Sequence, residues 1–280
     1  MTVPHLFIFG LGYSAEVLAQ RCLSTGWRVS GTTRSPERRA HLATLGITAH
    51  PFPLANGSAL HDVTHVLGSI PPDETGDPVL GTHDVGRAGW LGYLSSTGVY
   101  GNHGGAWVDE DSALLGTGAT ALARRHAEGA WRERGAHIFR VAGIYGPSRS
   151  ALDTVRAGRA QRLVKPGLVF SRIHVEDLAA TVQAALTRPA PGTVYNVADD
   201  LPAPPQDVVT HACELLGVPA PPERAYAEVE DTLSPALRGF YAESRRVRNT
   251  RLRTALGVTL RFPDYRAGLR AILSAEREPE

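Results

Sequence analysis

The chain has 280 residues, of which 42% are hydrophobic and 20% are charged, the composition of an ordinary globular protein. Its 29 basic and 28 acidic side chains leave a formal net charge of +1, so we expect neither nucleic acid nor an anionic membrane as a partner. The first apolar run, residues 5–9, is too short to cross a bilayer, and we expect no signal peptide before it. Cys22 and Cys213 form no C-x-x-C pair and are expected to be reduced core residues of a cytoplasmic protein.

The first 33 residues have the pattern of a strand, a turn, a helix and a second strand. Residues 5–9 are continuously apolar, as in a strand that is buried on both faces of a parallel sheet. Apolar residues from Ala15 to Leu23 then recur on one helical stripe, and Gly26 ends that helix. Residues 27–33 predict the second strand, which completes a βαβ unit.

The rest of the chain repeats this alternation less clearly. The pattern predicts a helix at 119–134 and strands at 64–70, 90–95, 137–141 and 194–197. Alternating strands and helices predict an α/β fold, a doubly wound parallel Rossmann sheet with helices on both faces. Because proline-rich turns follow residue 199, we place the Rossmann domain at 1–199 and a small C-terminal substrate-side lobe at 200–280. We expect residues 147–173 to contribute to that lobe.

The turn after the first strand reads Gly10-Leu11-Gly12-Tyr13-Ser14-Ala15, which fits G-x-G-x-x-A. Gly10 permits a tight turn, Gly12 has no side chain to block a pyrophosphate, and Ala15 lets helix and strand pack closely. The first N–H groups of the helix, from Tyr13 and Ser14 onward, offer partial positive charge to phosphates. The strand before the turn and the amphipathic helix after it favour a dinucleotide site over a purely structural turn.

The end of the second strand indicates which nicotinamide dinucleotide would bind. An NAD site usually has Asp or Glu about 20 residues after the glycines, on the ribose 2′-OH. This chain has Thr-Thr-Arg-Ser there, which suits a 2′-phosphate. We therefore predict NADP rather than NAD, with Thr33, Arg34 and Ser35 as contacts; the alternative is that Arg34 is a solvated loop cation. We also expect Ser69 and Ile70 to face the cofactor, although Ser-Ile-Pro-Pro also suits the simple end of a strand.

Three later segments resemble one superfamily. Residues 95–101 are similar to the S-S-x-x-V-Y-G strand end of the extended short-chain dehydrogenases/reductases, the NAD-dependent epimerase/dehydratase group. Residues 140–147 resemble that group's R-x-x-G-I-Y-G-P, and residues 174–179 resemble its H-V-x-D-x-A. With the glycine turn, these segments follow the family's order over about two-thirds of the chain, and the C-terminal part is similar to an atypical bacterial subgroup. The resemblance implies an oxidoreductase or epimerase that acts on a small polar, sugar-like substrate.

The catalytic set of this superfamily is a Ser or Thr followed by Tyr-x-x-x-Lys, whose phenol moves a proton while nicotinamide carries hydride. The resemblance places Ser96 at the Ser/Thr position, where it either touches substrate or only bonds the adjacent turn. It places Thr120 and Arg124 where Tyr and Lys belong. A threonine alcohol has a pKa far above the ~10 of tyrosine and cannot perform the same acid–base step. Arg124 could still bond the nicotinamide ribose, or it is a solvated helix arginine. Tyr100 is a candidate for the missing phenol, and otherwise a packing residue.

The remaining candidates are weaker. Tyr145 is a second candidate phenol at a strand end, and Arg172 could clamp an anionic substrate. Asp177 is expected to begin or cap a helix. His61 and His65 lack the Glu of H-E-x-x-H, so we expect no metal. The missing phenol leaves a second hypothesis, a protein that senses NADP(H) without catalysis. A homodimer is common in the superfamily that the chain resembles, but no stripe of residues isolates an interface.

Overall fold

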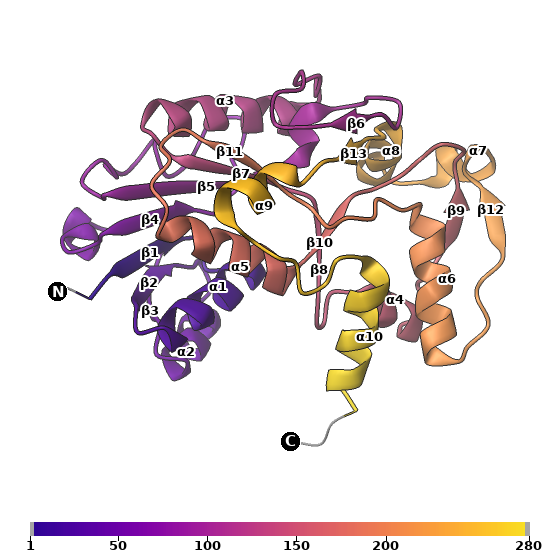
Figure 1. Ribbon diagram of the computed structural model, residues 1–280, viewed down its shortest axis with the longest axis horizontal. Helices are drawn as coiled ribbons and strands as arrows, with labels where there is room; N and C mark the ends of the chain where they lie inside the picture. Colours follow the sequence, from indigo (N-terminus) through magenta and orange to yellow (C-terminus); the bar gives the residue numbers. More distant parts are fainter. Residues whose placement is uncertain (1–2, 278–280) are drawn as a thin grey trace.

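The computed structural model describes residues 3–277. Its centre is a seven-stranded parallel sheet in the order β11-β7-β5-β4-β1-β2-β3 (Figure 1). The strands of this sheet are β1 (His5–Phe9), β2 (Arg28–Thr32), β3 (Thr48–His50), β4 (His65–Gly68), β5 (Trp90–Ser96), β7 (His137–Val141) and β11 (Val194–Val197). The predicted doubly wound α/β fold is confirmed, and the predicted strand at 64–70 is shorter than expected.

Helices cover both faces of the sheet because both faces are apolar. Along β1, Leu6 and Ile8 pack on one side with α1 (Tyr13–Ser24) and α5 (Val175–Leu186), which lie against each other. Phe7 and Phe9 point to the other side, into a cluster that includes α3 (Ala119–Glu133). α2 (Pro36–Thr44) follows β2 and packs on β3. The continuous apolar run of β1 is therefore explained by burial on both faces.

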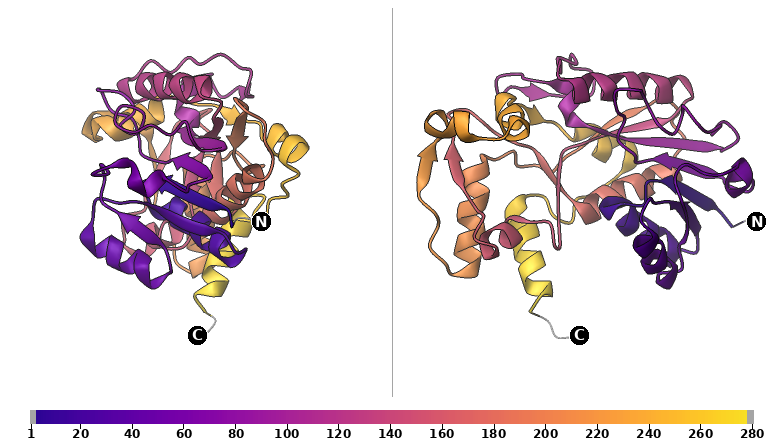
Figure 2. Two further views of the ribbon diagram at one scale, coloured as in Figure 1. Left: turned by 90° about the vertical axis from the view of Figure 1, so that its left-hand side faces the viewer. Right: turned by 180° about the vertical axis from the view of Figure 1, so that it is seen from behind.

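The smaller lobe lies beside the sheet and is built from two separate parts of the chain (Figure 2). The middle part supplies β8 (Gly143–Tyr145), α4 (Ala151–Arg156), β9 (Arg162–Val164) and β10 (Arg172–His174). The C-terminal part supplies α6 (Pro205–Leu216), β12 (Glu223–Ala225), α7 (Tyr226–Val229), α8 (Pro235–Ala242) and α10 (Tyr265–Ala275). β8 pairs with β10, β9 pairs with β12, and α6 packs on α4, β9 and α10, so the two parts share one core.

The C-terminal segment also returns to the sheet. β13 (Arg246–Val247) pairs with β6 (Trp107–Val108), and α9 (Thr250–Leu256) packs on β11 and α5. The Asp177 carboxylate accepts the N–H groups of Arg261 and Phe262 at 2.8 and 2.9 Å. As expected, Asp177 lies at the beginning of a helix, in the first turn of α5, but the N-cap is His174, and the Asp177 carboxylate anchors the returning chain. Within residues 3–277, no helix is long and apolar enough to cross a membrane.

A buried ion pair joins α3 to the sheet. The Arg140 guanidinium of β7 donates to the Glu128 carboxylate of α3 at 2.9 Å, and both side chains are only 4% exposed. Ser95 of β5 donates to the same carboxylate at 2.6 Å. Arg140 also donates to the Tyr100 hydroxyl at 3.0 Å, and that hydroxyl donates to Asn196 of β11 at 2.7 Å. This network fixes three adjacent strands and one helix relative to each other.

Replacing Glu128 by glutamine should destabilise the protein by about 3–5 kcal/mol, because Arg140 would remain charged and buried without a counter-charge. Glu276→Gln, which breaks the half-exposed pair with Arg156, should cost less than about 1 kcal/mol. Denaturant unfolding of both variants measures the difference. Equal effects of the two substitutions would show that the buried pair does not stabilise the fold.

Candidate cofactor and substrate site

The glycine turn between β1 and α1 contains two glycines that are required for different reasons. Gly10 has φ +93°, its N–H donates to Thr32 Oγ1 at 3.1 Å, and an added Cβ would lie 2.9 Å from Ile70 Cγ1. Gly12 has φ −90°, and the nearest atom to an added Cβ would be 4.0 Å away. The protein itself therefore has no steric need for glycine at position 12. The open space in front of Gly12 suits the close approach of a ligand.

The start of α1 has the open N–H groups that the predicted phosphate site requires. No side chain caps this helix, whose N-cap is Gly12. Within the described residues, the N–H groups of Tyr13, Ser14 and Ala15 have no acceptor. Free N–H groups at a helix start carry partial positive charge and bind phosphates. The Ala15 side chain is buried, which allows the close packing predicted for it, and the Tyr13 hydroxyl donates to Pro147 O at 3.0 Å.

A cavity of about 590 Å³ opens in front of this turn. The ends of β2 and β4 form its walls, and the predicted contacts Thr33, Arg34, Ser69 and Ile70 all line it. Ser35 does not line the cavity: its hydroxyl caps α2 by accepting the N–H of the third helical residue at 3.1 Å. The structure thus brings together most of the predicted nucleotide contacts.

Arg38 also lines this cavity, and the sequence analysis missed it. Its Nε donates to Leu11 O at 2.7 Å, and its Nη2 pairs with Glu16 at 2.7 Å. Arg34 differs from Arg38, because its side chain is exposed and has no ion-pair partner among residues 3–277. The only acidic side chain on the wall, Asp73, already accepts hydrogen bonds from Thr75. The cavity wall thus carries two arginines and one carboxylate, and Arg34 is the arginine without an ion-pair partner among residues 3–277.

A second cavity, of about 450 Å³, lies at the carboxyl ends of β5 and β7, between the sheet and the lobe. Ser96 lines it, and the Ser96 hydroxyl accepts the Gly98 N–H at 3.1 Å, which leaves the hydroxyl proton free to donate. Phe170, Arg172 and Phe240 line the lobe side of the cavity. Both cavities lie on the same edge of the sheet, so one extended dinucleotide can reach from the first to the second.

The other predicted catalytic side chains do not line this cavity. Thr120 is exposed at the start of α3 and lines neither cavity. Arg124 donates to Leu94 O at 2.8 Å. Tyr100 is fully buried, with its hydroxyl in the network of Arg140 described above. Ser96 is therefore the one residue of the predicted catalytic set on the cavity wall, and catalytic roles for the other three stay predictions.

The remaining candidates for an acid–base pair are engaged elsewhere. Tyr145 lines the cavity, but its hydroxyl donates to Asp264 O at 3.2 Å, and burial raises its pKa well above the ordinary value. Lys165, the only lysine of the sequence, donates from the lobe to Tyr241 O at 2.9 Å. The described residues thus contain no tyrosine–lysine pair at the cavity that could replace Tyr-x-x-x-Lys.

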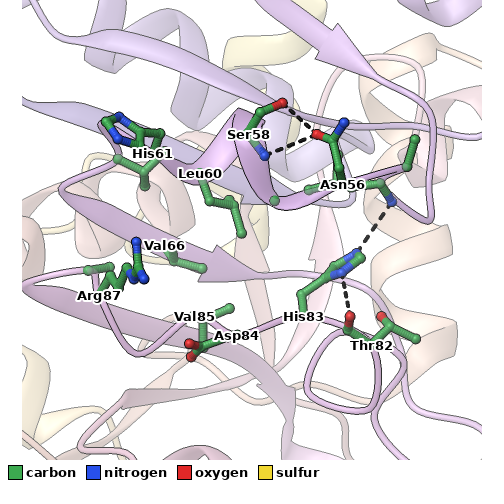
Figure 3. Close-up of a pocket in the computed structure, with 15 residues that line it drawn as sticks. Asn56, Ser58, Leu60, His61, Val66, Thr82, His83, Asp84, Val85 and Arg87 are labelled. Carbon is green, nitrogen blue, oxygen red and sulfur yellow. Dashed lines mark hydrogen bonds between the residues drawn. The ribbon is translucent and has the colours of Figure 1, made fainter.

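A third cavity, of about 570 Å³, lies near the amino end of β4 (Figure 3). His61, His83, Asp84 and Arg87 are among its lining residues, and His83 accepts the Leu54 N–H at 3.4 Å. Among residues 3–277, no group of three His, Cys, Asp or Glu side chains could hold a metal ion. Because ligands of open α/β sheets bind at the carboxyl ends of the strands, we assign the site to the first two cavities.

The chain was compared with known proteins. No family model matches it. A curated relative, the 3-diazoavenalumate denitrifying reductase of a Streptomyces species, is 33% identical over 146 residues, 47% of this chain. The matched part is 45% of the relative's length, so the chain matches less than half of that protein. A solved structure of a functionally unknown conserved protein from Silicibacter pomeroyi is 43% identical, with 99% of this chain and 100% of that chain covered and a TM-score of 0.92.

Two further solved structures share the fold at lower identity. One, described as an NAD-dependent epimerase/dehydratase from Methylobacillus flagellatus, is 22% identical, with 99% and 100% of the two chains covered and a TM-score of 0.73. The other, the human epimerase family protein SDR39U1 with NADPH, is 19% identical, with 98% and 100% covered and a TM-score of 0.77. The chain therefore belongs to one family with the Silicibacter pomeroyi protein, and its fold is that of the atypical extended short-chain dehydrogenases/reductases, as its motifs predicted.

Proposed function

We propose that this chain is an NADP(H)-dependent oxidoreductase or epimerase of the short-chain dehydrogenase/reductase type. The observation that carries the proposal is Gly12, which the fold does not require and which leaves the uncapped start of α1 open to a pyrophosphate. Two comparisons support this proposal: the human structural neighbour was solved with NADPH, and the curated relative is a reductase.

The preference for NADP over NAD rests on the end of β2. Thr33 and Arg34 line the cavity there, and the strand ends without the carboxylate that would bond a ribose 2′-OH. Arg34 is exposed and unpaired among the described residues, so its guanidinium is available to a 2′-phosphate. Arg38, held by Leu11 and Glu16, adds positive charge to the same rim.

A bound nicotinamide supplies or accepts hydride. Ser96 then has one role at the second cavity: its oxygen accepts the Gly98 N–H, and its hydroxyl proton is free to donate a hydrogen bond to a substrate oxygen or nitrogen. Such a donor polarises the substrate but remains a neutral alcohol, because its pKa is too high for proton transfer near neutral pH. The proposal therefore uses Ser96 as an orienting donor and takes the proton from solvent.

The cofactor preference is tested by titrating the protein with NADPH and NADH while tryptophan fluorescence is followed. We expect tight NADPH binding in the wild type and a loss of about 10- to 100-fold in Arg34→Ala, since one charge-assisted contact to phosphate is removed. NADH binding should not change. Arg39→Ala, on the helix α2 that follows Arg34 but not on the cavity wall, is the matched control and should behave as the wild type.

The NADP assignment fails if both nucleotides bind equally and Arg34→Ala weakens neither selectively. If neither nucleotide binds to the folded wild-type protein, the whole proposal is wrong.

The catalytic role of Ser96 is tested by NADPH oxidation over a panel of sugar nucleotides and small carbonyl compounds. For any substrate that is turned over, Ser96→Ala should lower kcat by about 100-fold, the usual loss of one oriented donor, with unchanged NADPH affinity. Ser24→Ala removes an exposed hydroxyl on α1 and should leave kcat unchanged. A Ser96→Ala variant with wild-type kcat would remove Ser96 from the mechanism.

A second candidate function is NADP(H) sensing without catalysis. The observation that favours it is the absence of tyrosine and lysine from α3, together with the distant engagement of Lys165. NADPH binding without turnover of any compound in the panel would favour this function.

A further inference from the structure

We propose that the cavity between the sheet and the lobe takes a small planar anion, an aromatic or conjugated carboxylate, as the substrate. This proposal deepens the proposed function and rests on it, because it assigns the molecule that Ser96 and the nicotinamide would meet. Two observations carry it: a stacked aromatic pair on the lobe side of the cavity, and, beside that pair, a partly buried arginine that forms no ion pair within the described residues.

The aromatic pair consists of Phe170 and Phe240, which both line the cavity. Their ring centroids are 4.1 Å apart with an interplanar angle of 29°, and Phe240 is 55% exposed. A single exposed phenylalanine needs no explanation. Here, however, the exposed ring stacks on a second ring at the wall of a cavity, which is the geometry that receives a flat apolar ligand.

Arg172 supplies the charge. Its Nη1 donates to Phe170 O at 2.9 Å and to Ala203 O at 3.0 Å, which fixes the guanidinium beside the aromatic pair. Its other nitrogen atoms have no partner among residues 3–277 and are not among the fully buried unpaired atoms, so a ligand in the cavity can reach them. A guanidinium with free N–H groups binds a carboxylate through two parallel hydrogen bonds.

No carboxylate of the described residues forms an ion pair with Arg172. Asp199 lies nearby, and its backbone N–H donates to Arg172 O at 2.6 Å, but its carboxylate does not come within ion-pair distance of the guanidinium; burial raises the pKa of the Asp199 carboxyl. Arg245, the other arginine of the cavity, pairs with Glu243 at 2.6 Å. Arg172 is therefore the arginine of the cavity wall without a direct ion pair among residues 3–277. Because a partly buried charge without a partner is costly, one negative charge on the ligand is favoured.

Phe170 of the aromatic pair and Arg172 lie on the same side of one extended segment. Phe170 and Arg172 are two residues apart in extended backbone, so their side chains project to the same face. With about 450 Å³, the cavity has the size of a small-molecule site. One free arginine fits one carboxylate, whereas a nucleoside diphosphate sugar carries two phosphate charges. These features favour a flat ring or conjugated chain that ends in a carboxylate.

The test uses calorimetric titration of the NADP⁺-loaded protein with four probes: trans-cinnamate, its neutral amide, the non-aromatic anion hexanoate, and UDP-glucose. We expect cinnamate to bind at least about tenfold more tightly than the amide, because the amide lacks the charge that pairs with Arg172. Hexanoate should bind about three- to tenfold more weakly than cinnamate, because it cannot stack. UDP-glucose should bind more weakly than cinnamate.

Two variants separate the two features. Phe240→Ala should weaken cinnamate binding about three- to tenfold and leave hexanoate unchanged. Val218→Ala, at another exposed apolar residue away from the cavity, is its control. Arg172→Gln should remove the preference for cinnamate over its amide. Since Arg172 also bonds two backbone carbonyls, Phe240→Ala and the acid–amide comparison on the wild type test the proposal if Arg172→Gln does not fold.

Equal binding of acid and amide, or an unchanged cinnamate affinity in Phe240→Ala, overturns the planar-anion proposal. Tighter binding of UDP-glucose than of cinnamate also overturns it. If NADPH binds but no probe does, this inference fails and the proposed cofactor function stands. If cinnamate binds but NADPH does not, the cofactor function fails and the cavity assignment stands.

Discussion

Parallel pairing of all seven strands is the constraint on which the rest of this molecule depends. It places the carboxyl ends of β1, β2, β4, β5 and β7 along one edge, and both assigned cavities lie on that edge. The buried Glu128–Arg140 pair then holds α3, β5 and β7 in register next to Ser96. In the proposed function, the sheet would position the cofactor contacts and Ser96, and the lobe would add Phe170, Arg172 and Phe240 on the far wall of the second cavity.

The features that depend on a short stretch of sequence were predicted best. The glycine turn, the strand that ends at Ser96 and the helix from Ala119 all carry short-range signals, and the structure has them. Ser35 was assigned to the nucleotide, although Ser-Pro-Glu is also a signature of a helix start, and the structure uses it as the N-cap of α2. Arg38 and Phe240 could not be found, since only the tertiary fold brings them to the cavities.

The missing phenol defines the chemistry that the site can support. In the described residues Tyr100 and Tyr145 have their hydroxyls engaged away from a substrate, and Lys165 lies in the lobe. The cavity wall offers the Ser96 hydroxyl as a neutral donor and Arg172 as an arginine without an ion pair among the described residues, in place of a phenol activated by lysine. The proposed function therefore requires a substrate that accepts hydride without a protein acid, and it assigns specificity to charge and stacking rather than to proton transfer.

The most direct test of the account is Gly12→Ala. The fold has room for the added methyl group, but a pyrophosphate bound against this turn would collide with it. The variant should keep its unfolding free energy within about 1 kcal/mol of the wild type and lose NADPH affinity by about 100-fold or more. Gly118→Ala, at the uncapped start of α3, has equal room and should keep both properties. A stable Gly12→Ala protein that binds NADPH as the wild type does would contradict the assignment of the cofactor to this turn.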